Sequence, residues 1–312
     1  PGNDMKQEGE FMPSAITDQL VAEEAEKLLP EGLQHIIERA PDEYFLGCQG
    51  PDMFFFYRIG SRSEYNLGKF LHRNRPYDVF RLFCRILSGE QNARFPVYSD
   101  EDRTRAFAYI LGYIAHYATD STFHPFVYHY MDKEKSEKRV HQLIENDWDV
   151  HFLRKFRGRE AEKFRCAFSA KKVAAGGAVA RLYACLAEEL GREEVKRRKF
   201  NAGLRNFWRY LTFFHGKCYS SQRAWEKLEH AFRAKPFLSC LYPRKHPDPE
   251  YLASDGFSRL SEGKGGNADE LFIRARDESA RLSVLFCECV RSGAPLPRED
   301  FSLSFLTAQP VE

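Results

Sequence analysis

Residues 112–125 read GYIAHYATDSTFHP, and the interpretation of the whole chain starts from this stretch. It is largely apolar, yet it carries His116, Asp120 and His124, each four positions after the last. On an α-helix such residues share one face, with Cβ atoms roughly 5–6 Å apart. Any one of them alone would more often be an ordinary core or helix-end residue. Burying all three without partners would be costly, so the group predicts a shared metal ion.

A second pair of the same kind follows, because His141 and Glu145 are also four residues apart. On spacing alone, a solvated helix surface is the commoner explanation for such a pair. Asp149 lies one further turn along and is placed to hydrogen-bond a ligand histidine. Upstream, Asp52 follows a Gly-Pro step in a loop, and His72 lies in a short apolar stretch. Histidine nitrogen and carboxylate oxygen are ligands that Zn²⁺ accepts, so the set predicts a multinuclear zinc hydrolase site.

The rest of the chain shows the apolar periodicity of helices, and alternating strand patterns are scarce. The expected helices cover residues 16–29, 33–39, 77–87, 103–119, 137–156, 172–190, 193–214, 221–233 and 269–290. Pro125 disfavours continuation of the helix 103–119 beyond the metal-type residues. Gly and Pro mark loops at residues 47–52 and 241–264. We therefore expect one all-α, multi-helical domain over residues 12–292, after a disordered or vector-derived segment 1–11 and before an irregular tail 293–312.

Composition excludes several classes of protein. Lys and Arg number 47 against 45 Asp and Glu, and this near balance gives no strong nucleic-acid signal. The basic run at residues 196–199 is read as a solvated helix face. Eight cysteines without a CxxC pair suggest buried, reduced thiols. No apolar run reaches membrane-spanning length, and no signal peptide opens the chain, so a cytoplasmic location is expected.

Taken together, these elements resemble the zinc-dependent phospholipase C family of bacteria. The resemblance is carried by Gly50-Pro51-Asp52, His72, His116-xxx-Asp120-xxx-His124-Pro125 and His141-xxx-Glu145. It covers about residues 12–150 and is weaker across the C-terminal half. It implies an all-helical fold, shared in type with the zinc nucleases, that holds a cluster of two zinc ions and, conditionally, a third.

The resemblance also implies which residues hold each ion. One ion would be bound by Asp52, His72, His116 and Asp120, and a second by His124, His141 and Glu145 with open positions for water. In the family a third ion shares the carboxylate that matches Asp120 and is bound by the N-terminal residue and a nearby His. That His falls on Asp18 in this chain. Three alternatives follow for the third site. It binds zinc with Asp18 as a ligand, it binds another metal, or it is empty.

The function implied is that of a metal-dependent phosphodiesterase, phospholipase C-like, which attacks a phosphoester with metal-activated water. Asp52 matches the residue proposed in the family as general base. The substrate would be a phosphoester small molecule or a phospholipid. Two alternatives stay open at this point. One is a zinc nuclease, which shares the helical trinuclear design, and the other is a non-catalytic protein whose metal cluster links its helices.

Overall fold

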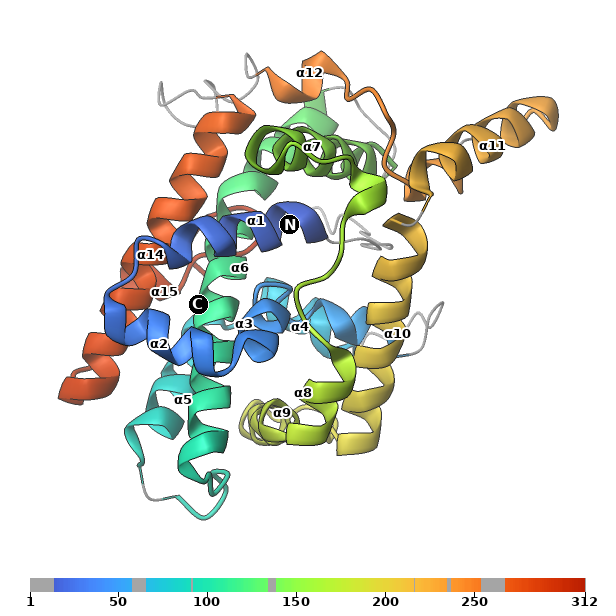
Figure 1. Ribbon diagram of the computed structural model, residues 1–312. Coiled ribbons are helices and arrows are strands. Elements are labelled where there is room, and N and C mark those ends of the chain that lie inside the picture. The colour runs from blue at the N-terminus through green and yellow to red at the C-terminus, as the bar shows by residue number, and fades with distance from the viewer. Residues whose placement is uncertain are drawn as a thin grey trace, which may run out of the picture.

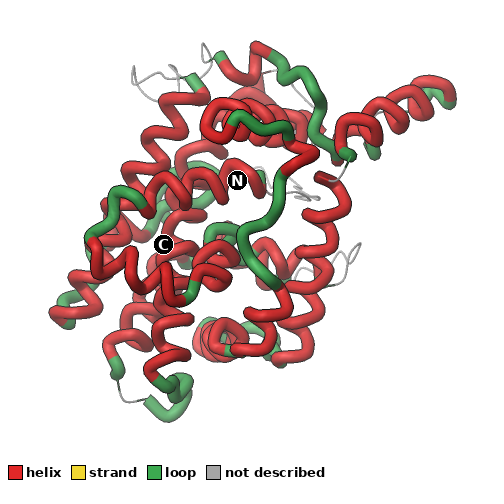
Figure 2. The backbone as a smooth tube through the Cα atoms, viewed as in Figure 1, coloured by secondary structure: helices red, strands yellow, loops and turns green. Residues whose placement is uncertain are grey.

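The computed structural model describes residues 14–57, 66–90, 92–133, 139–215, 217–234, 237–253 and 267–311. The N-terminal segment 1–11 and most of the second half of the expected loop 241–264 lie outside these residues. The described secondary structure is helical, apart from one isolated bridge between Leu303 and Pro310 (Figure 2). The expectation of an all-α fold is therefore confirmed.

Each expected helical region contains helix, and most bounds are shifted by only a few residues, apart from the two cases described below. The helices are α1 (Ala15–Glu26), α2 (Glu31–Arg39), α5 (Pro76–Ser88), α6 (Asp100–Lys133), α7 (Arg139–Arg157), α8 (Ala170–Gly176), α9 (Ala178–Glu189), α10 (Arg197–His215), α11 (Cys218–Ala231) and α14 (Ala268–Ser292). Short elements that periodicity did not predict are α3 (Pro41–Gly47), η1 (Asp52–Phe56), α4 (Leu67–Arg73), η2 (Ala161–Lys163), η3 (Ser239–Leu241), α12 (Pro249–Leu252) and α15 (Arg298–Phe301).

Helix α6 is the axis of the fold (Figure 1). Its 34 residues give it a length of about 50 Å. Helices α1, α2, α3, α9 and α14 all pack against it. The side chains of Tyr109, Tyr113 and Tyr117 are at most 1% exposed, because neighbours cover this helix on several sides. A helix enclosed in this way can present polar side chains to an interior site without contact with bulk water.

The expected end of this helix before Pro125 is wrong, because α6 continues through the proline to Lys133. A proline inside a helix costs roughly 3 kcal/mol. Phe123, Phe126 and Val127 are at most 4% exposed in a core that also contains Trp148 of α7. Burying each such side chain contributes about 1.5–3 kcal/mol, so packing on both sides of Pro125 outweighs its cost.

Two further expectations need adjustment. The region 172–190 is two helices, because Gly177 adopts a left-handed conformation with φ of +72° between α8 and α9. The C-terminal tail is not wholly irregular, since it contains α15 and places Phe301 and Phe305 in the main core at 0% and 1% exposure. Among the described helices, none combines the length and apolar character needed to cross a bilayer. The cytoplasmic location stays a prediction.

Two glycines allow α3 to lie directly on α6. A Cβ atom on Gly47 would be 2.1 Å from the carbonyl oxygen of Tyr109, and one on Gly112 would be 2.1 Å from that of Tyr44. Both obstacles are backbone atoms, which cannot rotate away. The end of α3, directly before the 48–51 loop, is thereby held against the middle of α6, and this contact sets where the loop and Asp52 lie.

We expect Gly112→Ala to destabilise the protein. The clash with backbone should cost about 3 kcal/mol, and the better helix propensity of alanine should return about 1 kcal/mol, so the free energy of unfolding should fall by roughly 2 kcal/mol or more. Urea unfolding measures the change. The control is Gly32→Ala in α2, where no heavy atom lies within 4 Å of the added Cβ. Equal stability of the two variants would contradict the close contact.

Candidate metal centre

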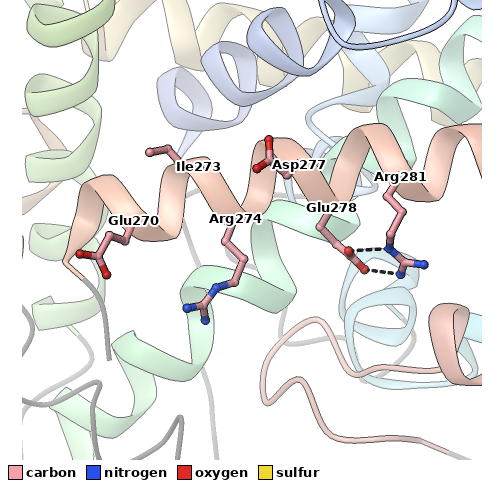
Figure 3. A pocket seen from close by; sticks show the side chains of 6 residues that line it. All are labelled: Glu270, Ile273, Arg274, Asp277, Glu278 and Arg281. Atoms are coloured by element: carbon pink, nitrogen blue, oxygen red, sulfur yellow. Dashed lines mark hydrogen bonds and ion pairs between the residues drawn. The ribbon is translucent and has the colours of Figure 1, made fainter. Parts of the chain in front are cut away.

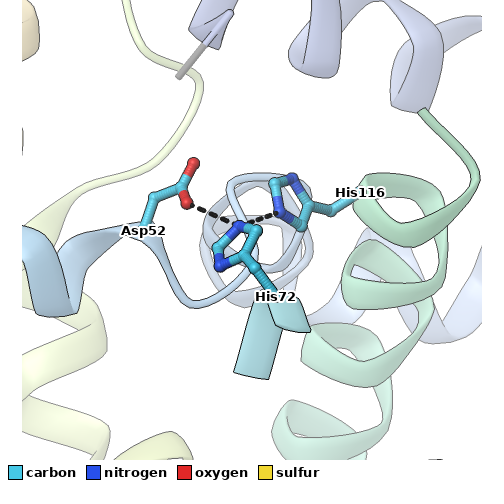
Figure 4. A group of neighbouring side chains, drawn as sticks. All are labelled: Asp52, His72 and His116. Atoms are coloured by element: carbon cyan, nitrogen blue, oxygen red, sulfur yellow. Dashed lines mark hydrogen bonds and ion pairs between the residues drawn. The ribbon is translucent and has the colours of Figure 1, made fainter. Parts of the chain in front are cut away.

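The first group of predicted ligands comes from three elements that meet beside α6. Asp52 begins η1, His72 lies in the last turn of α4, and His116 lies in the middle of α6. His72 Nε2 is 3.1 Å from Asp52 Oδ1 and 3.4 Å from His116 Nε2. Figure 4 shows the three side chains pointing toward one another. Their exposures of 4%, 5% and 1% place the group inside the protein.

Asp120 lies between this group and the next histidine along α6. Its Oδ2 atom is 3.6 Å from His72 Nε2, 3.3 Å from His116 Nε2 and 3.7 Å from His124 Nδ1. The same oxygen is buried and has no hydrogen-bond partner among the described residues. A buried carboxylate oxygen surrounded by ring nitrogens, but bonded to none of them, is suited to an ion that they share.

The second group joins α6 to α7. His124 Nε2 is 3.5 Å from Glu145 Oε1, and His141 Nε2 is 2.9 Å from the same oxygen. The other carboxylate oxygen of Glu145 is buried and has no hydrogen-bond partner within the described part of the chain. Suitable ligand atoms of these three residues lie within 4.8 Å of one another, as do those of Asp52, His72 and His116. Two compact N/O ligand groups are therefore present, with Asp120 between them.

Backbone carbonyls orient two of the histidine rings. Nδ1 of His72 is 2.7 Å from the carbonyl oxygen of Gly68, and Nδ1 of His124 is 2.9 Å from that of Phe305. A carbonyl only accepts, so both Nδ1 atoms carry the hydrogen and both rings direct Nε2 toward the acidic groups. This arrangement is typical of metal-binding histidines, whose outer nitrogen donates to an oxygen.

The centre requires positive charge. Burial alone lowers the pKa of His116, but the nearby charges of Asp120 and Asp18 raise it to about 10. His124 behaves alike, since Asp120 and Glu145 outweigh burial and bring its pKa to about 10. In the absence of a cation these rings therefore bind protons tightly. Four buried carboxylates lie at the centre, namely those of Asp18, Asp52, Asp120 and Glu145. When all are ionised they carry four negative charges, which two divalent cations would balance. The donor set and its unpartnered oxygens fit zinc.

Asp18 lies on the outer side of His116. Its Oδ2 atom is 3.4 Å from His116 Nδ1, an ion-pair contact longer than an ordinary hydrogen bond. Burial raises the pKa of Asp18 to about 8, against the His116 contact, which lowers it. Asp18, His116 and Asp120 form a third ligand group within 4.8 Å. The structure thus brings Asp18 to the centre, beside the two groups described above.

Asp149 does not contact the ligand histidines as expected. It accepts hydrogen bonds from the hydroxyl of Ser14 at 2.8 Å, from the backbone N–H of Thr17 at 2.8 Å and from its hydroxyl at 2.7 Å. Ser14 is the N-cap residue of α1, and Thr17 lies in its first turn, directly before Asp18. The histidine that approaches Asp149 is His215, which is not one of the predicted ligands and whose Nε2 atom lies 4.0 Å from Asp149 Oδ2. Asp149 therefore ties α1 to α7, and it acts on Asp18 through the backbone.

Sequence reasoning missed two residues that shape the site. Phe305 supplies the carbonyl for His124, and its ring centroid lies 5.4 Å from that of His72 and 5.8 Å from that of His116. Nothing in the tail sequence indicated this role, because the contact spans 181 residues. Gly50 has a φ of +51° and lies directly against the ring of His116. The Gly-Pro-Asp step at residues 50–52 was the sequence signal from which a close approach of this backbone to the site could have been predicted.

A surface hollow elsewhere does not belong to this centre. It lies along α14 and is lined by Glu270, Ile273, Arg274, Asp277, Glu278 and Arg281 (Figure 3). None of the predicted ligands lines it. Glu278 and Arg281 form an ion pair at 2.7 Å across one end, as on an ordinary charged helix surface.

We expect Asp120→Asn to reduce the zinc bound per chain by at least one ion, because the shared carboxylate charge is lost while the shape of the side chain is kept. Metal analysis of the purified protein gives the stoichiometry. The control is Asp100→Asn, an exposed carboxylate in the first turn of the same helix. Zinc content that is equal in the Asp120 variant and the wild type would contradict this role.

We expect Gly50→Ala to weaken zinc binding by about tenfold or more, the range seen when groups that orient a ligand are changed. The added Cβ would lie 2.0 Å from Cδ2 and 2.4 Å from Nε2 of His116, so the ring must move. Competition with a chromogenic chelator measures the affinity. Gly158→Ala is the matched control, since Gly158 also has positive φ, at +57°, but nothing within 4 Å of its Cβ position. If both variants bind zinc equally well, the ring contact is unimportant.

Comparison with known proteins agrees with this geometry. A family model described as zinc dependent phospholipase C matches residues 12–227, more than half of the chain. The match contains every predicted ligand and ends before Phe305. No match to a curated protein and no match to a solved structure was found. The family match spans the helices that bring the two ligand groups together, and the chain accordingly belongs to the zinc-dependent phospholipase C family.

Proposed function

We propose that this protein is a zinc-dependent phosphodiesterase that hydrolyses a phospholipid in the manner of a phospholipase C. The observation that carries the proposal is the convergence of histidine Nε2 atoms and unpartnered carboxylate oxygens around Asp120, within a chain of this family. A metal ion with a purely structural role needs only a closed set of protein ligands. This set is divided into two neighbouring groups, which suits a substrate that carries more than one phosphoryl oxygen.

The proposed ligand assignment follows the two groups. Asp52, His72, His116 and Asp120 would hold one ion, and His124, His141 and Glu145 would hold the second. Bound zinc supplies a Lewis acid for the phosphoryl group and lowers the pKa of water toward ~7. The orienting hydrogen bonds to Gly68 and Phe305 keep the rings in place before substrate arrives.

Asp52 is the proposed general base. It is 4% exposed and lies at the start of η1, directly after the loop that α3 and α6 position. Its Oδ1 atom faces His72 at 3.1 Å, and this contact holds the carboxylate at the edge of the first ligand group. A carboxylate so placed is suited to accept the proton of the attacking water.

Asp18 has two possible roles, as a ligand of a third ion or as a residue that orients His116, and one measurement distinguishes them. If a third ion binds, the second, unpartnered oxygen of Asp18 is its available ligand. If only two bind, Asp18 instead orients His116 through Nδ1. Zinc stoichiometry of Asp18→Asn distinguishes these roles. Loss of one ion supports a third site, whereas unchanged stoichiometry with weaker binding supports orientation of His116.

We expect the zinc-loaded protein to hydrolyse p-nitrophenyl phosphorylcholine faster than bis-p-nitrophenyl phosphate and to leave single-stranded DNA intact. Removal of metal with a chelator should abolish the activity, and added zinc should restore it. Asp52→Asn should lower kcat by about 10²-fold or more, because a general base typically contributes that much. Asp100→Asn is again the control.

The same assay contains the outcomes that contradict the proposal. Preferred cleavage of single-stranded DNA would identify a zinc nuclease instead. No turnover on any of the three substrates, with full zinc occupancy, would identify a cluster that only stabilises the fold.

A further inference from the structure

Exposed apolar side chains are concentrated in one part of the described chain. Eight large hydrophobic residues are exposed among the described residues as a whole, and five of them lie between residues 208 and 237. These five are Trp208 at 38%, Phe213 at 65%, Leu228 at 45%, Phe232 at 76% and Phe237 at 59% exposure. Single exposed hydrophobic residues are normal on a protein surface, but a local concentration marks an interaction site.

Helix α11 carries part of this surface on an arm that projects from the body of the molecule (Figure 1). Its main packing is against the short helices η2 and η3 near its base. Trp225, Leu228 and Phe232 are three and four residues apart, so they share one face of the helix. Trp225 packs on the core, whereas Leu228 and Phe232 are exposed toward the end of the arm.

The segment that carries these residues is rich in exposed basic side chains. Among the described residues from 197 to 233, the exposed charged side chains are eight Lys and Arg and one acidic residue, Glu226. The whole chain is nearly balanced, with 47 basic and 45 acidic residues, so the excess is local. Arg197 and Arg198, from the basic run 196–199 that looked like a solvated helix face, begin this segment, whereas Lys196 and Lys199 of the run form ion pairs with Glu194 and Glu193. Apolar side chains among basic ones are the combination that binds anionic membrane surfaces.

The inner face of α10 connects this surface to the metal centre. Asn206 donates a hydrogen bond to the carbonyl oxygen of Phe56 at 3.0 Å, and Phe56 ends the helix η1 that Asp52 begins. A Cβ on Gly203 would be 2.8 Å from the carbonyl oxygen of Met53, so α10 lies directly on η1. One helix thus contacts the element that carries Asp52 and presents Trp208 outward.

We propose that α10 and α11 form a docking surface for anionic phospholipid membranes. This surface, formed by the exposed residues among the described positions 197–215, 217–234 and 237, would insert Leu228 and Phe232 among the lipid chains while the basic residues contact the headgroups. The biological role of this surface rests on the proposed function, because a phospholipid substrate is part of a membrane. The binding itself requires no hydrolysis and can be measured separately.

Two other occupants fit the surface less well. A second copy of the chain would bring two basic surfaces together, and like charges oppose such contact. A nucleic acid would satisfy the basic residues, and its bases would stack on the aromatic rings, but it offers no apolar interior for Leu228. A bilayer supplies both negative charge and hydrocarbon.

The test is co-sedimentation of the zinc-loaded full chain with phosphatidylcholine vesicles that contain roughly one third phosphatidylserine. We expect binding that weakens as salt is added and that is much weaker on pure phosphatidylcholine. The double variant Leu228→Ser/Phe232→Ser should bind at least about tenfold more weakly, since two apolar side chains no longer leave water. Lys227→Glu should also lose about tenfold or more.

Matched controls separate docking from general damage. Ile273→Ser changes a side chain of α14 that is 46% exposed, close to the 45% of Leu228. Arg291→Glu reverses an exposed charge at the end of the same helix. Both should bind vesicles as the wild type does, and thermal unfolding checks that all variants fold. Equal binding by the Leu228→Ser/Phe232→Ser and Ile273→Ser variants would overturn the proposal.

Further outcomes are equally decisive. A wild-type dimer in light scattering that becomes monomeric in Leu228→Ser/Phe232→Ser, or binding of single-stranded DNA without binding of vesicles, would overturn the proposal. Asp120→Asn should still bind anionic vesicles, which supports docking independently of catalysis. Vesicle binding without any phosphodiester hydrolysis by the wild type would leave the docking surface standing and would refute the proposed function alone.

Discussion

The negative charge buried beside α6 constrains the rest of this structure. Asp120 places a carboxylate oxygen within 3.3–3.7 Å of nitrogens from three histidines, and no described residue hydrogen-bonds to that oxygen. Such a group is stable inside a protein only when protons or cations compensate it. The raised pKa values of His116 and His124 have the same cause, because the nearby carboxylates favour positive charge on both rings. The surrounding helices enclose this charge and hold its compensating groups in position.

That enclosure depends on contacts at some distance from the centre. The glycine contact between α3 and α6 sets the position of the loop before Asp52. Asp149 on α7 holds the first turn of α1, and so places Asp18 beside His116. The tail brings the carbonyl of Phe305 to His124. Each contact joins segments far apart in the sequence, so the ligand geometry forms together with the fold.

The same packing joins the interior site to the outside of the molecule. Helix α10 lies on η1 with one face and presents basic and aromatic residues with the other. Helix α11 continues this surface away from the body of the protein. A phospholipid-hydrolysing enzyme must act at the boundary between water and hydrocarbon. A rigid helix between the candidate metal centre and the proposed docking surface would keep that geometry constant during binding.

The sequence by itself determined the helical class and the set of metal-type residues, because both follow local rules. Apolar periodicity identified each long helix, and four-residue spacing placed His116, Asp120 and His124 on one face of α6. Local rules failed at Pro125, where burial of Phe123 and Phe126 outweighs the cost of the proline. They also failed for the partners of Asp149 and for Phe305. Those contacts are hydrogen bonds across 132 and 181 residues, and only tertiary packing decides which donor and acceptor meet over such distances.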